Sequence, residues 1–324
     1  MNRMKTNDDL NYLRKITDLA HDYYLNKLSL GEISKKYHLS RYLIAKYLDD
    51  AISQGLIKIT INAPQERNFE LENKFRQLFA IENIFILKDS ENPSLKNENV
   101  IAFAAKHIQS LINDSQIIGL AWGDTVYRVI DAFAPKVKEN LVFTQFIGEN
   151  MKYKSAAGSG RMVEKVAAKY DAHFVTIAGP LYIVNNQIRE LLKKEPAFDH
   201  AMSLTKKIDL IFCGIGTLSS IESIPAWNES KSIIFPNVDF ENVAGMLYGR
   251  PYNSDGQFLN IVNDKTFGLD IKSILQIPRR VAFTNSKFKA RAMLGALRGK
   301  LLTDIIIDES IAQRILMEAG DNTL

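Results

Sequence analysis

Residues 29–58, SLGEISKKYHLSRYLIAKYLDDAISQGLIK, decide how the first part of the chain is organised. The helical spacing of Leu30 and Ile33 predicts a first helix, and a tight turn at residues 38–40 follows it. The Ser40 hydroxyl is placed to cap a second helix, because it can accept a hydrogen bond from an unpaired backbone N–H. The stretch therefore predicts a helix, a tight turn and another helix.

The second helix is expected to have an apolar side and a polar side. Its core side is predicted to carry Leu43, Tyr47 and Ile52. Gly55 is expected to end it, because glycine readily adopts the left-handed conformation found after many helices. Residues 56–61 then alternate like a strand, which would add a wing to the motif.

The outward residues of this motif suit DNA. A helix-turn-helix places its second helix in the major groove, with the first residues of that helix on base edges. Basic side chains around it can meet phosphates and release counterions. The residues predicted to bind DNA are Lys35, Lys36, Ser40, Arg41, Tyr42 and Lys46. A helical hairpin with a solvated basic face would look similar, so that alternative stays open.

Composition indicates a globular protein of more than one domain. The chain has 324 residues, of which 46% are hydrophobic and 24% charged. Its net charge is +4, and residues 1–62 hold ten Lys/Arg and seven Asp/Glu, so +3 of that charge surrounds the motif. Cys213 is the only cysteine, and it lies in an apolar run. We therefore expect a buried thiol, no intrachain disulfide and a reducing, cytoplasmic location.

Several other classes of protein are not indicated. The N-terminus has no apolar signal-peptide core, and no run of about 18 apolar residues predicts a membrane span. The five histidines are scattered without paired metal-ligand spacing, so no metal site is predicted. The chain has neither a GxxxxGK[ST] loop nor GxGxxG after its first strand, so no ATP or NAD cofactor is predicted.

The rest of the chain predicts a second, larger domain. The polar, Pro-containing stretch 63–68 is expected to be a linker between a domain at 1–62 and a domain at 69–324. Strands and helices alternate through this second part, and the strands are continuous apolar runs such as IIGLA and DIIID. The pattern predicts an α/β fold with a mostly parallel, Rossmann-like sheet covered by helices on both faces.

Three glycine-containing turns lead from predicted strands into helices. Ligands bind beyond the carboxyl ends of parallel strands, where free N–H groups at a helix start attract anions. The first turn, residues 119–125, offers Gly123, Asp124 and Thr125, and the second offers Gly214, Gly216 and Thr217. Gly158-Ser159-Gly160 is the third. We expect these turns to bind a small polar anion, although α/β proteins also place glycine there for geometry alone.

Lys289 is the most plausible charged anchor for such an anion. It follows the strand predicted to end near Thr284 and begins a helix, so its ammonium could pair with a phosphate. A solvated helix lysine would have the same spacing, and this alternative stays open.

In four segments the chain resembles the SorC family of bacterial sugar-responsive transcriptional regulators. These segments are GLAWGDTVYRV (119–129), IDLIFCGIGTL (208–218), GRPYNSDG (249–256) and KARAMLGALRGKLLTDIIIDE (289–309). The resemblance implies an N-terminal helix-turn-helix and an effector domain similar to sugar-phosphate isomerase and CoA-transferase folds. It also implies operator DNA, a phosphorylated sugar or related metabolite as effector, and a homo-oligomer, commonly a dimer or tetramer.

The resemblance also implies roles for single residues. Gly123 and Thr125 match a WGxT loop near the effector, and Lys289 matches the lysine of a GGxxK motif that meets its phosphate. The second glycine turn matches at Gly214, Gly216 and Thr217. Three positions depart from the family pattern: Asn285-Ser286 replaces Gly-Gly, Ile307-Asp308 replaces Thr-Asp, and Met246 replaces an acidic residue. Met246 removes an acceptor for sugar hydroxyls, so an altered, less hydroxylated effector is expected.

Two other functions remain as alternatives. A sugar-phosphate isomerase or hydrolase with an accessory DNA-binding domain would need a positioned acid or base. The candidates are Asp124, Asp255, Asp264 and Glu309, and none is paired with a histidine or second carboxylate in the sequence. The other alternative is a regulator that has lost effector binding, as the changes at Met246 and Asn285-Ser286 would allow.

Overall fold

The computed structural model describes residues 7–57, 66–90, 93–150 and 158–320. The chain divides into two compact units, Met1–Pro64 and Gln65–Leu324, and each unit is a body of its own. Within the described ranges no helix is long and apolar enough to cross a membrane.

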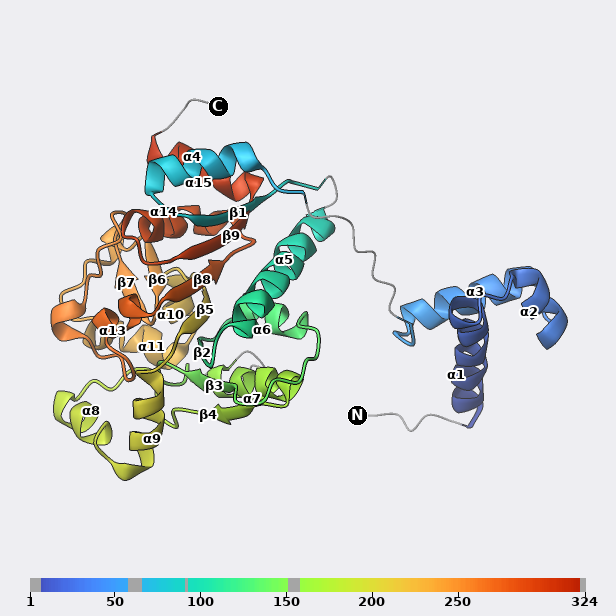
Figure 1. Ribbon diagram of the computed structural model, residues 1–324, viewed down its shortest axis with the longest axis horizontal. Coiled ribbons are helices and arrows are strands. Elements are labelled where there is room, and N and C mark those ends of the chain that lie inside the picture. Colours follow the sequence, from blue (N-terminus) through green and yellow to red (C-terminus); the bar gives the residue numbers. More distant parts are fainter. Residues whose placement is uncertain (1–6, 58–65, 91–92, 151–157, 321–324) are drawn as a thin grey trace. The chain divides into compact units, whose positions relative to one another are not determined.

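The first unit is a small helical domain (Figure 1, blue). Its elements are α1 (Asn7–Ala20), a π-helical turn (His21–Leu25), α2 (Leu30–Tyr37) and α3 (Arg41–Ser53). Leu19 of α1, Ile33 of α2 and Ile44 of α3 are fully buried against one another. These contacts hold the three helices together, as the apolar spacing of the sequence predicts.

The turn between α2 and α3 confirms the predicted helix-turn-helix. Ser29 and Glu32 form a capping box at the start of α2, which satisfies backbone N–H groups that would otherwise lack a partner. His38 ends α2 in the left-handed conformation, with φ 56°. The Ser40 hydroxyl accepts from the backbone N–H of Leu43 at 3.2 Å, so Ser40 caps α3 as predicted.

The core side of α3 differs from the prediction. Ile52 is 41% exposed, Leu43 is half-buried, and Tyr47 lies at the margin of the core. The buried stripe consists of Ile44, Leu48 and Ala51. These residues are spaced i, i+4 and i+7, which is the face that α3 turns to α1 and α2. Residues 58–61 of the predicted wing and 63–65 of the predicted linker lie outside the described residues.

The second unit is built on a parallel sheet, which confirms the predicted fold class. In the described residues this sheet has seven strands, in the order β1-β9-β8-β5-β2-β3-β4, and each neighbouring pair is parallel. The strands are β1 (Asn83–Leu87), β2 (Ile117–Leu120), β3 (Val142–Gln145), β4 (His173–Val175), β5 (Leu210–Gly214), β8 (Arg279–Phe283) and β9 (Asp304–Asp308). Strands β2 and β9 lie on the apolar runs IIGLA and DIIID that the sequence predicts as strands.

Helices cover both faces of this sheet (Figure 1). One face packs against α5 (Pro93–Asn113), α6 (Asp124–Asp131) and α7 (Ser159–Tyr170). The other face packs against α4 (Phe69–Phe79), α14 (Ala290–Arg298) and α15 (Glu309–Ala319). Strand residues alternate between the two cores: Leu210 and Phe212 contact the first, whereas Ile211 and Cys213 contact the second. Double coverage explains why the strands are apolar throughout.

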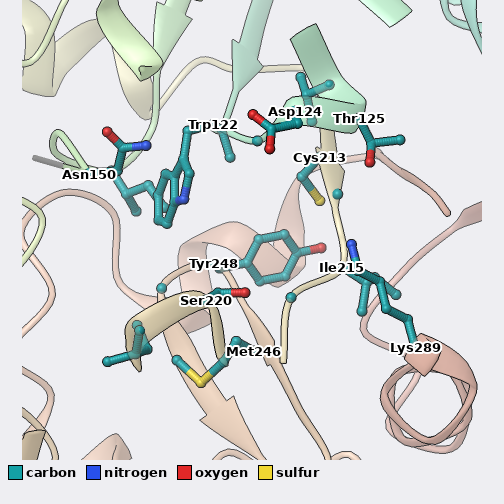
Figure 2. A pocket seen from close by; sticks show the side chains of 18 of the residues that line it. Trp122, Asp124, Thr125, Asn150, Cys213, Ile215, Ser220, Met246, Tyr248 and Lys289 are labelled. Atoms are coloured by element: carbon teal, nitrogen blue, oxygen red, sulfur yellow. The ribbon is translucent and has the colours of Figure 1, made fainter. Parts of the chain in front are cut away.

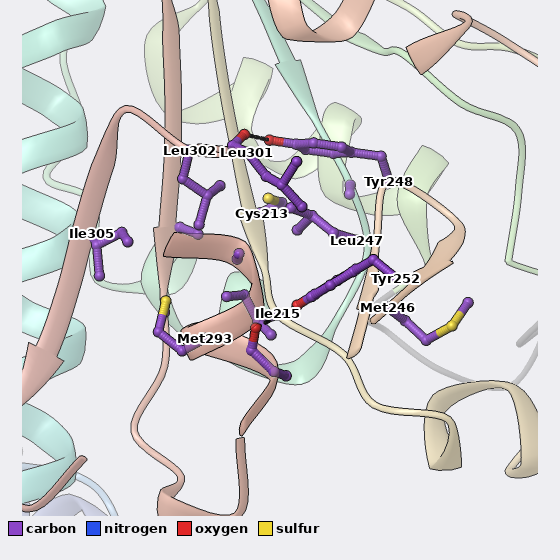
Figure 3. Packing of buried hydrophobic residues seen from close by; sticks show 14 of the residues in the cluster. Cys213, Ile215, Met246, Leu247, Tyr248, Tyr252, Met293, Leu301, Leu302 and Ile305 are labelled. Carbon is purple, nitrogen blue, oxygen red and sulfur yellow. Dashed lines mark hydrogen bonds between the residues drawn. The ribbon is translucent and has the colours of Figure 1, made fainter. Parts of the chain in front are cut away.

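The region between β5 and β8 was not foreseen by the sequence pattern. It holds α10 (Ser219–Glu222), α11 (Pro225–Glu229), α12 (Lys231–Ile234), α13 (Ile271–Gln276), and 3-10 turns at Phe240–Asn242 and Ile261–Asn263. It also holds the antiparallel hairpin of β6 (Gly245–Leu247) and β7 (Arg250–Tyr252). Elements of three to six residues are too short to show a period. Figure 3 shows the hairpin residues packed with Cys213, Ile215 and Met293 in one apolar core.

Three further short helices complete the unit. They are α8 (Asn186–Leu192), α9 (Pro196–Thr205) and a 3-10 turn at Lys287–Lys289 that precedes α14. Burial of Cys213 raises the pKa of its thiol to about 12, so the expected inert, buried cysteine is confirmed.

The order of the strands creates a switch point between β2 and β5. After β2 the chain moves outward through β3 to β4, and it then returns to the other side of β2 to form β5. The chain leaves β2 towards α6 on one face and leaves β5 towards α10 on the opposite face. In open parallel sheets the crevice that opens beyond the carboxyl ends at such a point is where ligands bind.

Candidate functional site

A cavity of about 220 Å³ lies at this switch point. Its walls come from the turns that follow β2, β5 and β8, and from the β6–β7 hairpin (Figure 2). Seven of the eight residues predicted to bind an effector line it: Gly123, Asp124, Thr125, Gly214, Gly216, Met246 and Lys289. These seven come from four segments that are far apart in the sequence.

The start of α6 faces this cavity with its backbone N–H groups uncapped. Gly123 precedes the helix with φ 138° and ψ 148°, a backbone conformation that favours glycine. No side chain among the described residues caps this helix start. Unpaired N–H groups and the helix dipole both attract negative charge. Thr125, in the same first turn, adds a hydroxyl to the cavity wall.

The glycine turns after β2 and β5 approach each other beside this helix start. A Cβ placed on Gly123 would lie 3.9 Å from Val126 Cγ2, and one placed on Gly214 would lie 3.8 Å from the same atom. Both turns therefore border Val126, with open space on the cavity side. The convergence of these two turns is what the strand-to-helix pattern predicts.

Lys289 extends its ammonium into the same cavity (Figure 2). Burial lowers the pKa of Lys289 below its usual 10.5, and the charge of Asp124 partly opposes that effect. Among the residues that the structure describes, no hydrogen bond or ion pair engages this ammonium. A desolvated cation without a partner is stabilised when an anion binds beside it.

In the turn after β5, the backbone N–H and carbonyl of Gly216 are both hydrogen-bonded to Met246 of the β6–β7 hairpin. The N–H of Gly216 donates to the carbonyl of Met246 at 3.0 Å, and the N–H of Met246 donates back at 2.9 Å. A Cβ on Gly216 would lie 2.9 Å from Ser220 Oγ and 3.3 Å from Met246 Cβ, so close packing excludes a side chain there. Gly216 therefore positions the hairpin, and its N–H is not available to a ligand.

Thr217 and the third glycine turn do not reach the cavity. The Thr217 N–H donates to Ser220 Oγ at 3.3 Å, and Thr217 is not among the lining residues. At the third turn the Gly160 N–H donates to the Glu149 carboxylate at 2.8 Å. A carboxylate of the protein thus occupies the start of α7, which explains why this turn does not serve as a second open anion site.

Several lining residues were missed in the sequence. Trp122 is next to the glycine turn and could have been inferred from that position, whereas Tyr182 and Tyr248 come from distant loops. The Tyr182 hydroxyl donates to the Gly249 carbonyl at 2.7 Å, and the Tyr248 hydroxyl donates to the Leu301 carbonyl at 2.9 Å. Burial raises the pKa of both phenols above the usual 10. Both tyrosines are therefore neutral donors with fixed partners.

The other carboxylates considered as catalytic groups lie away from the cavity. Asp264 pairs with the buried Arg250 at 2.7 Å. Glu309 accepts from Asn68 and from the Asp89 N–H. Asp255 lies in an exposed turn. Among the described lining residues Asp124 is the one carboxylate, and the lining includes no histidine.

In the first unit, the residues predicted to bind DNA lie on α2, at the cap of α3 and in the first half of α3. Arg41, Lys46 and Lys35 are exposed, and Tyr42 is 81% exposed. The Ser40 hydroxyl caps α3, so the exposed side chains available to DNA are those of the other predicted residues.

Lys36 has a structural partner that the sequence does not reveal. Its ammonium lies 2.7 Å from the Asp22 carboxylate, which is buried in the first unit. Tyr37 and Asn26 donate to the same carboxylate at 2.8 and 2.9 Å. The hydrogen bond from Lys36 is the largest of the effects that lower the pKa of Asp22 to about 2. Lys36 therefore differs from Lys35, whose exposed side chain extends freely from α2.

Comparison with known proteins places this geometry in context. A family model described as "Putative sugar-binding domain" matches residues 63–317. The chain is 21% identical over 326 residues to the uncharacterized transcriptional regulator YjhU of Escherichia coli K12, covering 98% of each chain. It is 22% identical to the sorbitol operon regulator of Klebsiella pneumoniae, covering 97% of this chain and 100% of that one.

Solved structures show the same fold. The full-length sorbitol operon regulator SorC from Klebsiella pneumoniae matches with a TM-score of 0.65 and 19% identity, over 94% of this chain and 99% of that one. A transcriptional regulator from Streptococcus pneumoniae TIGR4 matches with a TM-score of 0.67 and 20% identity, over 78% of this chain and 98% of that one.

Proposed function

The chain belongs to the SorC family of transcriptional regulators, which carries this sugar-binding domain, and from that premise we propose how its two units work. The protein is an effector-sensing transcriptional regulator. The cavity beside α6 binds a small phosphorylated sugar or related metabolite, and the surface around α3 binds operator DNA in the bacterial cytoplasm. The functional form is a homo-oligomer, a dimer or tetramer.

The convergence of Lys289 and the start of α6 on one cavity carries this proposal. An unpaired ammonium and uncapped helix N–H groups favour an anionic group, and a phosphate accepts hydrogen bonds from both. Thr125 offers a hydroxyl to the same group. The whole cavity, with a volume of about 220 Å³, has room for a small ligand but not for a macromolecule.

On the DNA side, Arg41, Tyr42 and Lys46 contact base edges from the start of α3, and Lys35 contacts phosphates. Their exposure supports these roles. A two-fold symmetric pair of subunits would place its two α3 helices about 34 Å apart, on a near-palindromic site. An effector that prefers one arrangement of the subunits then changes operator affinity by shifting the population of arrangements.

We propose that the cavity binds its ligand without converting it. General acid–base catalysis needs a group that accepts a proton and one that returns it, within reach of the substrate. Asp124 stands without a second carboxylate or a histidine among the described lining residues. A panel of pentose and hexose phosphates incubated with the protein should show no conversion above blank.

Tryptophan fluorescence provides the direct test. The chain has two tryptophans: Trp122 lines the cavity, and Trp227 lies edge-on to it with ring centres 6.5 Å apart. Titration of the full-length protein with the same panel should give a saturable change with at least one sugar phosphate and none with its unphosphorylated sugar. If no phosphorylated sugar changes the signal, or if the free sugar binds equally well, the proposed site is wrong.

A further inference from the structure

We propose that a hydrogen bond between Asn68 and Glu309 carries the state of the effector cavity to the segment that leads to the DNA-binding unit. The inference rests on the proposed function and adds how the cavity at Lys289 acts on the rest of the chain. Glu309 is a positioning residue in this account, because it does not line the cavity and acts through the segment that it holds.

The segment in question is residues 66–68, where the described part of the second unit begins. These residues belong to the linker predicted from the sequence, yet they pair with the end of β1. The Asn68 N–H donates to the Ile86 carbonyl at 2.7 Å, and the Lys88 N–H donates to the Glu66 carbonyl at 2.8 Å. The chain from the first unit therefore reaches the second unit as a short antiparallel bridge on the strand β1.

Most contacts of this segment come from α4 and β1, its neighbours in the sequence. The Arg67 guanidinium donates twice to the fully buried Glu72 carboxylate of α4, at 2.8 and 2.6 Å. It also lies over the rings of Phe69 and Phe85, 4.8 Å from each ring centre. The Asn68 carboxamide oxygen caps α4. These contacts fix the segment to elements that do not line the cavity.

Glu309 differs from these partners because it belongs to an element near the cavity. Its carboxylate accepts from the Asn68 carboxamide N–H at 2.6 Å and from the Asp89 N–H at 2.9 Å. Glu309 is the first residue of α15, the helix that follows β9. Figure 1 shows α15 beside α4, with β1 and β9 beneath them. The segment 66–68 is thus held from one side by α4 and β1 and from another by α15.

The same helix contacts the 3-10 turn Lys287–Lys289, which carries the cationic group of the cavity. The start of α15 is well fixed: Asp308 accepts from the Ile311 N–H at 2.9 Å, and Ile311 is fully buried. A packed helix moves as a unit, because its buried side chains cannot shift singly without clashes or voids. A movement of the turn at Lys289 is therefore passed to Glu309.

Effector binding supplies such a movement. A phosphate that pairs with the Lys289 ammonium also takes hydrogen bonds from the start of α6, so it draws the two cavity walls together. When α15 follows the turn, Glu309 either takes Asn68 with it or loses that hydrogen bond. Both outcomes change the direction in which the chain leaves β1. The arrangement of two DNA-binding units on a near-palindromic site then changes as well.

The test exchanges the two partners of this hydrogen bond. Asn68→Asp keeps an oxygen that caps α4, but it removes the donor and places a carboxylate against Glu309. When Glu309→Gln is added, the new amide N–H can donate to that carboxylate, and the amide oxygen still accepts from the Asp89 N–H. Asn73→Asp is the matched control, because Asn73 is exposed on α4 and contacts Arg76 instead.

The readout is the shift in operator affinity that a sugar phosphate causes in the full-length protein. Fluorescence anisotropy measures it with DNA from upstream of the protein's own coding region, with and without ribose 5-phosphate, glucose 6-phosphate or fructose 6-phosphate. Tryptophan fluorescence measures the affinity for the phosphate itself. Amide exchange of Lys88 reports whether the segment stays paired with β1. We expect a severalfold shift in the wild type and a shift at least about twofold smaller in Asn68→Asp.

Four outcomes decide the inference. A reduced shift in Asn68→Asp that returns in the double variant, with phosphate affinity unchanged and Asn73→Asp like the wild type, supports it. An unchanged shift in Asn68→Asp, a loss that the double variant does not restore, or an equal loss in Asn73→Asp overturns it and leaves the proposed function standing. A loss of shift that only follows a loss of phosphate affinity also overturns it. If no phosphate alters the operator affinity of the wild type, the proposed control of DNA binding by the cavity falls together with this inference.

Discussion

Lys36 in the first unit and Lys289 in the second carry the same charge in opposite surroundings. The Lys36 ammonium is exposed at one side and bonded to the buried carboxylate of Asp22. The Lys289 ammonium is partly buried in the cavity, and among the described residues it forms no hydrogen bond or ion pair, although the charge of Asp124 acts on it. The difference teaches that a lysine is available to a ligand when no carboxylate of the fold is bonded to its ammonium.

The start of α7 gives the same lesson for helix ends. Glu149 accepts from the Gly160 N–H there, whereas no described side chain caps α6 at Gly123. The two glycine turns thus differ in whether a carboxylate of the protein accepts a hydrogen bond from the helix start.

Lys289→Met should have the largest effect. Loss of a charged hydrogen-bond donor to a phosphate costs roughly 1.5–3 kcal/mol, so effector affinity should fall by roughly 10- to 150-fold. The matched control is Lys287→Met, since Lys287 is exposed two residues earlier and does not line the cavity. Fluorescence titration with the best sugar phosphate measures both. Equal losses in the two variants would remove the special role of Lys289.

Lys36→Met should loosen the first unit, because it leaves the buried Asp22 carboxylate with fewer partners. We expect faster amide hydrogen exchange across residues 7–53 in this variant and unchanged exchange in Lys35→Met. Normal exchange in Lys36→Met would show that the contact with Asp22 is incidental.

Lys35→Met should instead weaken DNA binding to all sequences alike. The slope of log affinity against log salt concentration should fall by about one, because one phosphate contact is lost.

Arg41→Ala should reduce sequence discrimination by roughly 1–3 kcal/mol, because arginine at the start of a recognition helix reads base edges. Fluorescence anisotropy with DNA from upstream of the protein's own coding region, against scrambled DNA, measures this difference. The affinity for scrambled DNA should change much less. If the affinity for both DNAs fell equally, Arg41 would contact phosphates, as proposed for Lys35, and would not read bases.

Acid should destabilise the first unit through Asp22. Its folded-state pKa is about 2, below the ordinary 3.8, so the charged carboxylate stabilises the fold. That contribution is complete above the ordinary pKa and is lost as the pH falls from about 4 towards about 2. Circular dichroism of urea unfolding between pH 5 and 2.5 measures the loss, and Lys36→Met should show a flatter dependence. Identical slopes in the two proteins would contradict this assignment.

A smaller effect is expected at alkaline pH for the effector. Burial lowers the pKa of Lys289 below 10.5, and only the charged form attracts an anion. Effector affinity should therefore decline as the pH rises towards 10.5, before ordinary lysines lose their charge. Titrations between pH 7 and 10.5 follow this trend, and it should be absent in Lys289→Met. Constant affinity over that range in the wild type would count against a role for the ammonium.

Much of this fold could be predicted from the sequence because its signals are local. Strands such as β9 are continuous apolar runs, and Ser40 is followed by an apolar helical pattern. The same reasoning brought six residues of the cavity together, since parallel strands end at one edge of a sheet. The seventh, Met246, lies in the antiparallel strand β6 and was named only through the resemblance to the family.

The rest could not be predicted because it depends on pairing across the chain. Asp22 and Lys36 are 14 residues apart, and their pairing requires the π-helical turn to face α2. The two hydrogen bonds between Gly216 and Met246 depend on a hairpin whose strands have three residues each. Thr217 follows the same glycine turn as Gly214, yet a local hydrogen bond to Ser220 holds it outside the cavity lining.

The central claim is that the cavity at Lys289 controls the DNA-binding surface around α3. It is tested most directly by operator affinity, measured by fluorescence anisotropy with and without a saturating sugar phosphate, in wild type and Lys289→Met. The account predicts that a sugar phosphate shifts the affinity of the wild type severalfold in either direction and leaves Lys289→Met unchanged. An operator affinity that no sugar phosphate alters, or that shifts equally in both proteins, would contradict it.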